Sequence, residues 1–290
     1  MKIKIKLILS IIFLITTLSL FAYEQYAKAE MGSLRIYFLD VGQGDAILIR
    51  TPEGKDILVD GGPDDMVLEK LDEALPFWDR YIDIVVLTHP HADHINGLYE
   101  VMKRYKVDFV LEPSIDKKPE SMVYFNNSVE TLIGSESIIN PIQGDSIVLG
   151  DGLVMNFLYP FEPDLKEEDL NDTSLIFRLS YGKIDFLFTG DATEKLEKKI
   201  IKENLESEFL KVAHHGSRYS SSSEFLEAVR PLISIISVGK DNKFGHPTQD
   251  AIDRLSDVGS KFIRTDISGT VRVDVDKYGI WKIKCSKGCG

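Results

Sequence analysis

Short apolar runs, separated by turns that contain glycine or proline, open the body of the chain. Residues 35–39, 46–50 and 57–59 are such runs, and the segments between them are Val41-Gly42-Gln43-Gly44-Asp45 and Thr51-Pro52-Glu53-Gly54. Apolar runs of this length between turn residues are typical of strands that pair with their neighbours. The pattern therefore predicts a meander of paired strands at the start of the body.

Helical spacing of apolar residues begins after this meander. An acidic stretch without apolar periodicity, residues 161–172, is predicted to be a surface loop. The predicted helices are 65–75, 95–105 and 123–133, and the predicted strands are 84–87, 107–111 and short pieces within 138–158.

The second half of the chain repeats an order of strand, loop and helix. The predicted strands are 174–179, 184–188, 209–212, 232–238, 262–264, 270–275 and 280–283, with helices from Thr193 and over 247–255. Polar motifs directly follow several strands, in Thr189-Gly190-Asp191, Ala213-His214-His215-Gly216-Ser217 and Gly245-His246-Pro247. We expect such residues to lie along one edge of a sheet or sandwich. The two halves share this order without detectable sequence repetition.

The N-terminal end has the features of a leader. Lys2, Lys4 and Lys6 precede the apolar run 7–23, and Ala27-Lys28-Ala29 matches the small-x-small rule for signal peptidase. A signal peptide over residues 1–29 is one interpretation. An uncleaved anchor is the other, because the run is at the lower limit for spanning a bilayer. Both predict a secreted or an extracytoplasmic, membrane-anchored body.

The rest of the chain is assigned to one domain, residues 30–284, and a tail, residues 285–290. The length of 290 residues and 43% apolar content are sufficient for a buried core. The two cysteines, Cys285 and Cys289, stand in the tail. They either form a small disulfide, as export would allow, or remain thiols of a frayed end.

The charge of the body limits its partners. The leader holds four lysines and one glutamate, so the remainder keeps 30 basic and 45 acidic residues, a net charge of −15. This argues against a broad electrostatic surface for nucleic acid. A phosphodiester substrate stays compatible, because two divalent cations would make the cleft locally positive.

The densest chemistry lies in Thr88-His89-Pro90-His91-Ala92-Asp93-His94, between a predicted strand and a predicted helix. All six histidines of the chain stand in short motifs with Gly, Ser, Asp or Pro. Imidazole nitrogen and carboxylate oxygen are usual ligands of divalent metals, and the H-x-H-x-D-H spacing lets alternate residues face two adjacent ions. We therefore expect His89 and His91 on one metal, and Asp93 and His94 on the other. Asp60, past a strand end, either makes a turn or orients a ligand histidine.

Four motifs in this order, Asp60-Gly61-Gly62, residues 88–94, Thr189-Gly190-Asp191 and His214-His215, resemble those of a metallo-β-lactamase-fold hydrolase. Further motifs resemble the extracytoplasmic hydrolase domain of the DNA-uptake competence family ComEC, over about residues 34–274. These are Asp40-Val41-Gly42-Gln43-Gly44-Asp45-Ala46, Asn171-Asp172-Thr173-Ser174-Leu175, Ala213-His214-His215-Gly216-Ser217 and Gly245-His246-Pro247. The chain has only one long apolar segment, so the multi-span channel of that family is not expected and DNA import is not inferred. Asn96 replaces a more usual glycine, a change we expect to be tolerated.

The resemblance implies an α+β, four-layer αβ/βα sandwich with a dinuclear site at one sheet edge. It implies that His89, His91 and Asp191 hold the first metal, with Asp191 bridging to the second. Asp93, His94 and His214 would hold the second metal together with Asp191. His215 could replace His214, because a sequence cannot orient two consecutive imidazoles.

A departure from the family concerns the first metal. The superfamily usually supplies a third histidine just before the strand that leads to Asp191, and this chain has Asn171-Asp172 there. We predict that Asp172 completes the shell; the alternative is an Asx turn. An oxygen-richer site would shift the preference from zinc toward manganese. The predicted cofactors are two divalent metal ions, zinc or manganese.

Two ions roughly 3.5–4 Å apart would share a hydroxide and present it to a phosphorus or carbonyl centre. Asp93 could accept its proton. Ser217, the Gly216 amide and His246 are candidates for binding the phosphate or protonating the leaving group. Turn formation and a helix start at Pro247 explain these three residues equally well.

The leading prediction is an exported metal-dependent phosphodiesterase or nuclease that prefers short or single-stranded DNA to duplex. A lactone, β-lactam or thioester hydrolase is disfavoured, because the commonest β-lactamases of this type use a cysteine ligand and neither cysteine lies in a ligand motif. The third hypothesis is a non-catalytic surface module that binds nucleic acid or cell-wall polymer. The leader, if uncleaved, would attach the body to the cell envelope, and no stable protein partner is inferred.

Overall fold

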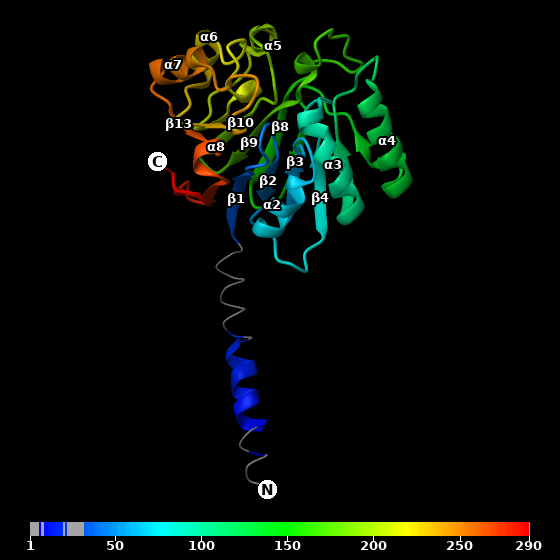
Figure 1. Cartoon of the computed structure of the whole chain (residues 1–290), viewed down its shortest axis with the longest axis vertical. Helices are drawn as coiled ribbons and strands as arrows, with labels where there is room; N and C mark the ends of the chain where they lie inside the picture. Colours follow the sequence, from blue (N-terminus) through cyan, green and yellow to red (C-terminus); the bar gives the residue numbers. More distant parts are fainter. Residues whose placement is uncertain (1–5, 7–8, 20, 22–31, 290) are drawn as a thin grey trace.

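The computed structural model describes residues 6, 9–19, 21 and 32–289, and its body contains two β-sheets (Figure 1). The strands of the first sheet are β1 (Ser33–Phe38), β2 (Ile47–Arg50), β3 (Asp56–Val59), β4 (Tyr81–Val86), β5 (Lys106–Leu111), β6 (Ile138–Ile139), β14 (Val271–Asp276) and β15 (Trp281–Cys285). Those of the second are β7 (Ser146–Val148), β8 (Leu153–Tyr159), β9 (Ile176–Tyr181), β10 (Ile184–Phe188), β11 (Phe209–Lys211), β12 (Ile233–Ile236) and β13 (Lys261–Arg264). Their orders are β15-β14-β1-β2-β3-β4-β5-β6 and β13-β12-β11-β10-β9-β8-β7.

Helices cover the outer face of each sheet. On the first sheet these are α2 (Met66–Ala74), α3 (Ala92–Arg104) and α4 (Glu120–Ile133), which share one apolar cluster with its strands. On the second sheet α5 (Glu194–Ile200), α6 (Ser223–Val229) and α7 (Gln249–Asp257) do the same. The remaining helical segments are α8 (Thr265–Ser268) and the 3₁₀ turns η1 (Ser135–Ser137), η2 (Leu170–Thr173) and η3 (Ala213–Gly216). The predicted four-layer sandwich is confirmed.

Alternation along the strands produces these layers. In β1, Ile36 and Phe38 face the second sheet, while Tyr37 belongs to the cluster under the helices. In β10, Phe186 faces inward and Leu187 faces the helices in the same way. Both faces of these strands are therefore buried, which explains why the sequence shows continuous apolar runs there and no polar alternation.

The ends of the parallel strands place the polar motifs together. Strands β3, β4 and β5 run parallel, as do β10, β11, β12 and β13. Asp60 follows β3, residues 88–94 follow β4, Asp191 follows β10, and His214 and His215 follow β11. Carboxyl ends of parallel strands meet at one edge of a sheet, so the predicted gathering of these motifs is realised.

Three segments differ from, or extend, what the sequence predicts. Helix α3 begins at Ala92, so Asp93 and His94 lie in its first turn and not in a loop before a helix that starts at residue 95. Helix α7 begins at Gln249, because the Thr248 hydroxyl accepts a hydrogen bond from the Ala251 amide (3.4 Å) and caps it, so the predicted helix start at Pro247 is wrong. Cys285, the last residue of β15, forms a disulfide with Cys289, which is one of the two states considered for the tail.

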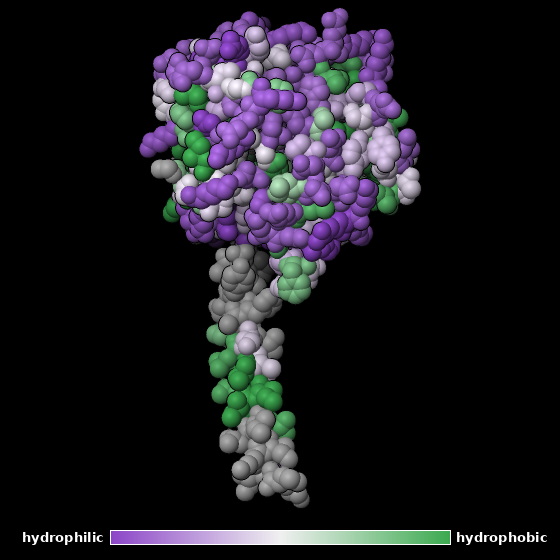
Figure 2. All heavy atoms as spheres, in the orientation of Figure 1, coloured by the Kyte–Doolittle hydropathy of each residue, from purple (hydrophilic) through white to green (hydrophobic). Residues whose placement is uncertain are grey.

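The leader is described only in part. Residues 9–19 are helical, and Figure 2 shows apolar side chains gathered on them, whereas the visible face of the body is mainly hydrophilic. Within the described parts of the chain, no helix combines the length and apolar character needed to cross a bilayer. The cleavage motif at residues 27–29 lies outside the described residues, so cleavage and anchoring both stay predictions.

The backbone of helix α3 is in direct contact with the backbone of the turn that follows β3. The Gly61 amide donates to the His94 carbonyl (2.7 Å), and the Gly97 amide donates to the Gly62 carbonyl (3.1 Å). A Cβ atom on Gly97 would lie 1.8 Å from the Gly61 carbonyl oxygen. Only glycine therefore allows this contact, which brings the start of α3 onto the turn that carries Asp60.

We expect Gly97→Ala to lower the free energy of unfolding by about 1–3 kcal/mol, because the added methyl must push the helix away from the turn. Asn96→Ala, one position earlier and partly exposed, should stay within about 0.5 kcal/mol of the wild type. Urea unfolding of the two variants checks this. Equal stabilities would show that the helix and turn can separate without loss.

Candidate metal centre

A buried carboxylate holds one histidine of the segment 88–94 in place. Asp60 is fully buried and accepts hydrogen bonds from the Thr88 amide and hydroxyl (both 2.7 Å) and from Nδ1 of His94 (2.8 Å). With its proton on Nδ1, His94 directs Nε2 away from Asp60. Of the two roles that the sequence left open for Asp60, the structure supports orientation of a ligand histidine.

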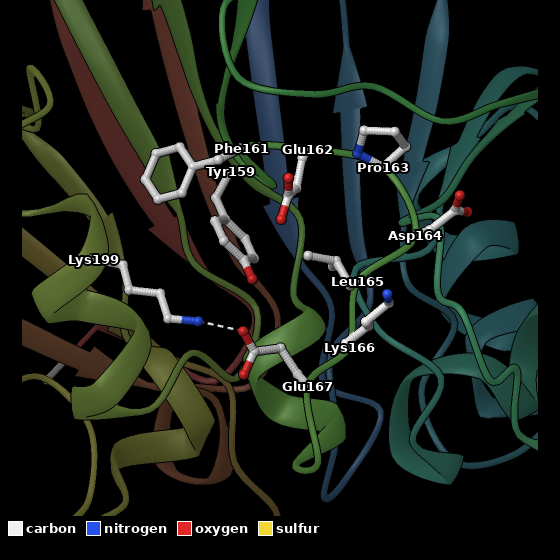
Figure 3. A pocket seen from close by; sticks show the side chains of 9 residues that line it. All are labelled: Tyr159, Phe161, Glu162, Pro163, Asp164, Leu165, Lys166, Glu167 and Lys199. Carbon is white, nitrogen blue, oxygen red and sulfur yellow. Dashed lines mark hydrogen bonds and ion pairs between the residues drawn. The ribbon is translucent and has the colours of Figure 1, made fainter.

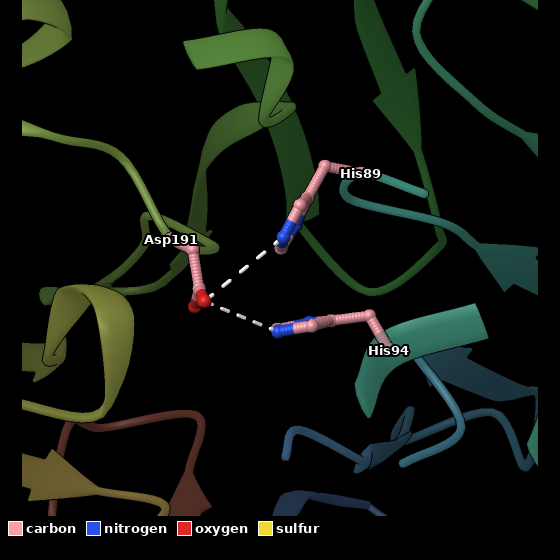
Figure 4. Close-up of side chains that lie close together, drawn as sticks. All are labelled: His89, His94 and Asp191. Atoms are coloured by element: carbon pink, nitrogen blue, oxygen red, sulfur yellow. Dashed lines mark ion pairs between the residues drawn. The ribbon is translucent and has the colours of Figure 1, made fainter. Parts of the chain in front are cut away.

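Asp191 is the point on which the imidazoles converge. Its Oδ2 lies 3.3 Å from Nε2 of His94 and 3.4 Å from Nε2 of His215. Nε2 of His89 and of His214 lie 3.9 Å from the same oxygen. Figure 4 shows His89 and His94 approaching Asp191 from the opposite side of the site. One carboxylate oxygen thus faces imidazoles contributed by both sheets.

The rest of the segment 88–94, which includes the first turn of α3, completes this side of the centre. Nε2 of buried His89 and Nδ1 of partly exposed His91 are 3.1 Å apart. Asp93 places Oδ2 3.4 Å from Nε2 of His215, and its side chain is 30% exposed. His89, Asp93 and His94 therefore each belong to a close group of candidate ligands, whereas His91 contacts His89 and belongs to none of these groups among the described residues.

The His214-His215 turn has an uncommon backbone. Both residues lie in the left-handed region, with φ/ψ of 49°/45° and 54°/24°, which non-glycine residues seldom adopt in succession. The turn buries His215, whose Nδ1 donates to the Ser237 carbonyl (2.8 Å) and whose Nε2 faces Asp93 and Asp191. His214 stays 27% exposed. The geometry favours His215 over His214 as a ligand.

Divalent metals fit the residues present. Two of the close groups are His89, His94 and Asp191, and Asp93, His94 and His215; within each group the potential ligand atoms lie within 4.8 Å of one another. Among the described residues, Asp191 Oδ1 and the Nε2 atoms of His94 and His215 are buried without a hydrogen-bond partner. Buried polar atoms are normally paired, so several unpaired acceptors aimed at one point indicate a cation site.

The ionisation of the cluster agrees with this. Burial raises the pKa of Asp191, but His215 and His94 outweigh it and hold that pKa well below the usual value. Burial lowers the pKa of His94, but Asp191 and Asp60 reverse the effect and raise it well above its usual range. Asp191 is therefore charged, and binding of a metal to His94 must release a proton.

The carboxylate of Asp172 contacts residues that lie outside the close groups of His and Asp. Its Oδ1 accepts from the Thr193 hydroxyl (2.5 Å), and its Oδ2 lies 3.5 Å from Nζ of Lys195. Lys195 also pairs with Glu167 (2.8 Å), which lines a cavity of about 430 Å³ together with Tyr159 and Lys199 (Figure 3). Asp172 belongs to none of the close His and Asp groups among the described residues. Its predicted role as a ligand stays a prediction.

The two other candidates for substrate contact differ from each other. Ser217 is buried, and its hydroxyl accepts from the Tyr219 amide (3.3 Å), as a turn-forming serine would. The ring of His246 lies 5.7 Å from that of His214, centroid to centroid, and its Nδ1 has no partner among the described residues. Burial, followed by the neighbouring His214 and His215, lowers the pKa of His246 to about 4. His246 is therefore neutral at pH 7.

Sequence reasoning missed two buried charges beside the centre. Nζ of Lys211 lies 2.6 Å from Oδ2 of Asp45, and both side chains are almost fully buried. Asp45 also stands 3.6 Å from Nδ1 of His215 and 3.9 Å from Nδ1 of His94. A signal was present for Lys211, because it is the single charged residue in the apolar run just before the Ala213–Ser217 motif.

Comparison with known proteins agrees with the fold and the motifs. Residues 39–240 match the family model described as the metallo-beta-lactamase superfamily. The chain belongs to the metallo-β-lactamase superfamily. Members of this superfamily are generally metal-dependent hydrolases that bind divalent ions, often two, and the cluster around Asp191 supplies ligands of that kind.

Its similar relatives include competence and recombination proteins. The chain is 28% identical to ComE operon protein 3 of Bacillus subtilis (strain 168), over 81% of this chain and 32% of that protein. It is 30% identical to competence protein ComA of Neisseria gonorrhoeae, over 83% and 32%, and to recombination protein 2 of Haemophilus influenzae, over 81% and 28%. The chain thus spans about a third of the length of these relatives. The predicted resemblance is confirmed.

Solved structures show the same fold at low sequence identity. CmlA, a diiron beta-hydroxylase from Streptomyces venezuelae, superposes with a TM-score of 0.54 at 16% identity, covering 85% of this chain and 54% of that one. Zn(2+)-bound PqqB from Methylobacterium extorquens gives 0.52 at 12% identity, covering 86% and 99%. At such identities the likeness concerns the fold alone.

We expect His215→Ala to lose at least one bound ion and His214→Ala to keep both, because only His215 is buried with Nε2 facing both Asp93 and Asp191. Asp191→Asn serves as the positive control for metal loss. Elemental analysis of the purified proteins measures the metal content. Metal loss in His214→Ala alone would assign the ligand to His214.

The predicted role of Asp172 has its own test. Asp172→Ala should weaken one of two metal sites selectively if this carboxylate is a ligand. Thr193→Ala removes the hydroxyl partner, keeps the carboxylate, and should leave metal binding unchanged. Calorimetric titration with manganese compares them. Wild-type affinities for both ions in Asp172→Ala would limit Asp172 to its contacts with Thr193 and Lys195.

Proposed function

We propose that the chain is an exported, dinuclear metal-dependent phosphodiesterase that acts on short or single-stranded DNA. The observation that carries the proposal is a pair of close His and Asp groups that share His94. Asp191 Oδ1 and the Nε2 atoms of His94 and His215 are buried in these groups without a hydrogen-bond partner among the described residues. The likeness to competence and recombination proteins supports a nucleic-acid substrate. The lysines and apolar run of the leader support export.

Two divalent ions, zinc or manganese, would supply Lewis-acid activation of a water molecule and offset the charge of a phosphate. The protein's own residues provide the remaining parts. Asp60 keeps Nε2 of His94 turned toward the centre, and the Ser237 carbonyl does the same for His215. Asp93 is the most exposed carboxylate of the cluster and is placed to accept a proton from incoming water.

The loop before α7 provides the side of the site toward which a substrate would extend. The Asn242 side chain accepts from the His246 amide (3.0 Å) and donates to the His246 carbonyl (2.6 Å), so the loop is held at both groups. Because His246 is neutral at pH 7, we assign it a hydrogen bond to the phosphate or leaving group.

An exposed aromatic ring extends this side of the site. Phe244 is 54% exposed, and its ring is nearly parallel to that of His246, at 17° with centroids 6.0 Å apart. Nζ of Lys243 stands 5.1 Å above the Phe244 ring. An aromatic face with a nearby cation suits an unpaired base and its backbone, which favours single-stranded over duplex DNA.

The decisive experiment incubates the full chain with manganese or zinc and four substrates. These are a single-stranded oligonucleotide, the corresponding duplex, bis-p-nitrophenyl phosphate and nitrocefin. We expect metal-dependent cleavage of the phosphodiesters, fastest on the single strand, because a body with a net charge of −15 repels the more densely charged duplex more strongly. Nitrocefin turnover without phosphodiesterase activity would replace this proposal by a β-lactam or related hydrolase. Inactivity on all four would favour a binding module.

His246→Ala should lower turnover of the single strand about a hundredfold while both metals stay bound, because it removes a hydrogen-bond donor but no ligand. Gln249→Ala, an exposed position at the start of α7, is the matched control and should keep wild-type turnover. Steady-state kinetics and elemental analysis are measured on the same preparations. Unchanged turnover in His246→Ala would remove this residue from the site.

A further inference from the structure

The ion pair between Asp45 and Lys211 joins the two sheets directly beneath the metal centre. Asp45 lies in the loop between β1 and β2 of the first sheet, and Lys211 ends β11 of the second. Nζ of Lys211 is 2.6 Å from Oδ2 of Asp45, with the side chains 1% and 2% exposed, and it also donates to the Val212 carbonyl (3.0 Å). The pair is therefore dry and spans the interface between the sheets.

Such a pair needs a reason other than stability. Removing two charges from water is expensive, and a well-packed apolar pair often serves the fold equally well. Asp45 is also unnecessary for orienting either nearby histidine, because Asp60 already accepts from Nδ1 of His94, and the Ser237 carbonyl accepts from Nδ1 of His215. What these two bonds leave undetermined is the distance between His94 and His215.

The Asp45 loop is bonded to both sides of the centre. On the first side, the Asp45 amide donates to the Asp93 carbonyl (3.2 Å), and the Gly62 amide donates to the Asp45 carbonyl (2.7 Å). On the second side, beside the ion pair with Lys211, the Gly239 amide donates to Oε1 of Gln43 (3.1 Å). The loop therefore links the side of the centre that holds His94 to the side that holds His215, whose separation the two histidine-orienting bonds do not set.

The packing of the loop leaves little freedom for this span to change. A Cβ atom on Gly44 would lie 2.2 Å from the Asp93 carbonyl oxygen, and one on Gly239 would lie 2.6 Å from the Gln43 nitrogen. The loop is thus in backbone contact with the first turn of α3 on one side and with the segment after β12 on the other.

We propose that Asp45 and Lys211 are positioning residues that set the separation of the two halves of the metal centre. One half consists of His89, Asp93 and His94, and the other of Asp191 and His215. The proposal rests on the proposed function, because it requires that two ions bind between these halves. Lys211 neutralises Asp45, so the carboxylate ties the sheets together without adding net charge to the site.

The test is the double variant Asp45→Asn/Lys211→Met in the full chain. It removes the ion pair, keeps the net charge and nearly keeps the side-chain volumes. We expect the melting temperature of the metal-free variant to be close to that of the wild type. The second manganese ion should bind at least about tenfold more weakly, and electron paramagnetic resonance should show an altered magnetic coupling between the two ions. A merely structural role would leave affinity and coupling unchanged in a variant that folds.

Two further variants complete the design. Arg50→Met/Asp56→Asn removes another ion pair of low exposure (2.7 Å), at the opposite ends of β2 and β3 from the centre, and should keep wild-type metal affinity. Gln43→Ala removes only the bond to Gly239 and should weaken the second ion by a smaller factor. It tests the same span if the double variant does not fold.

The outcomes separate the two levels of the argument. A wild-type chain that binds fewer than two ions would overturn the dinuclear centre, and the positioning role with it. If the wild type binds two ions tightly, the dinuclear centre stands. The positioning role alone would be overturned if the double variant or Gln43→Ala then showed the affinity and magnetic coupling of the wild type. Weakened and uncoupled second-ion binding in these variants, with the Arg50 and Asp56 control intact, supports it.

Discussion

The organisation of this protein depends on one buried carboxylate that faces imidazoles from two different sheets. Asp191 lies at the end of β10, and its Oδ2 is within 4 Å of four histidine nitrogens. Desolvation would disfavour its charge, yet the surrounding imidazoles keep it ionised. A charge in that position requires positive partners at fixed distances, so the two sheets must meet at this edge with little tolerance.

The apolar layer between the sheets provides that rigidity. Phe38 of the first sheet stacks on Phe188 of the second, with ring centroids 6.3 Å apart, and Phe188 also stacks on Phe177 of the neighbouring strand (4.7 Å). An interior packed in this way changes shape little, so loops at its edge can hold charged groups in place. The layer supplies the platform, and the polar bonds at its edge, from Asp60, Ser237 and the Asp45 loop, determine how each ligand is turned.

The motifs in the sequence were sufficient to predict the fold and most of the cluster, since their spacing places His89, His91, Asp93 and His94 in one short segment after a strand. The spacing does not predict which way each side chain points. His215 faces inward because two successive residues adopt left-handed backbone angles, which no spacing rule indicates. Asp172 has the position expected of a ligand, but its nearest partner is the Thr193 hydroxyl, a contact between distant segments. The Asp45–Lys211 pair is equally non-local, and such pairings exist only once the sheets are packed.

The pairing of β1 with β14 has a consequence for the order in which the molecule can assemble. Residues 33–38 align antiparallel with 271–276, so the first strand of the body, β1, pairs with the next-to-last strand, β14, in the first sheet. That sheet remains incomplete, with one side of β1 unpaired, until nearly the whole polypeptide has been synthesised. A nascent or truncated chain would therefore expose the unpaired backbone N–H and C=O groups of β1, which can pair with another chain and lead to aggregation. This topology has a high contact order, and the first sheet can be completed only late in biosynthesis. The ligands from the two sheets can meet only after the first sheet is complete.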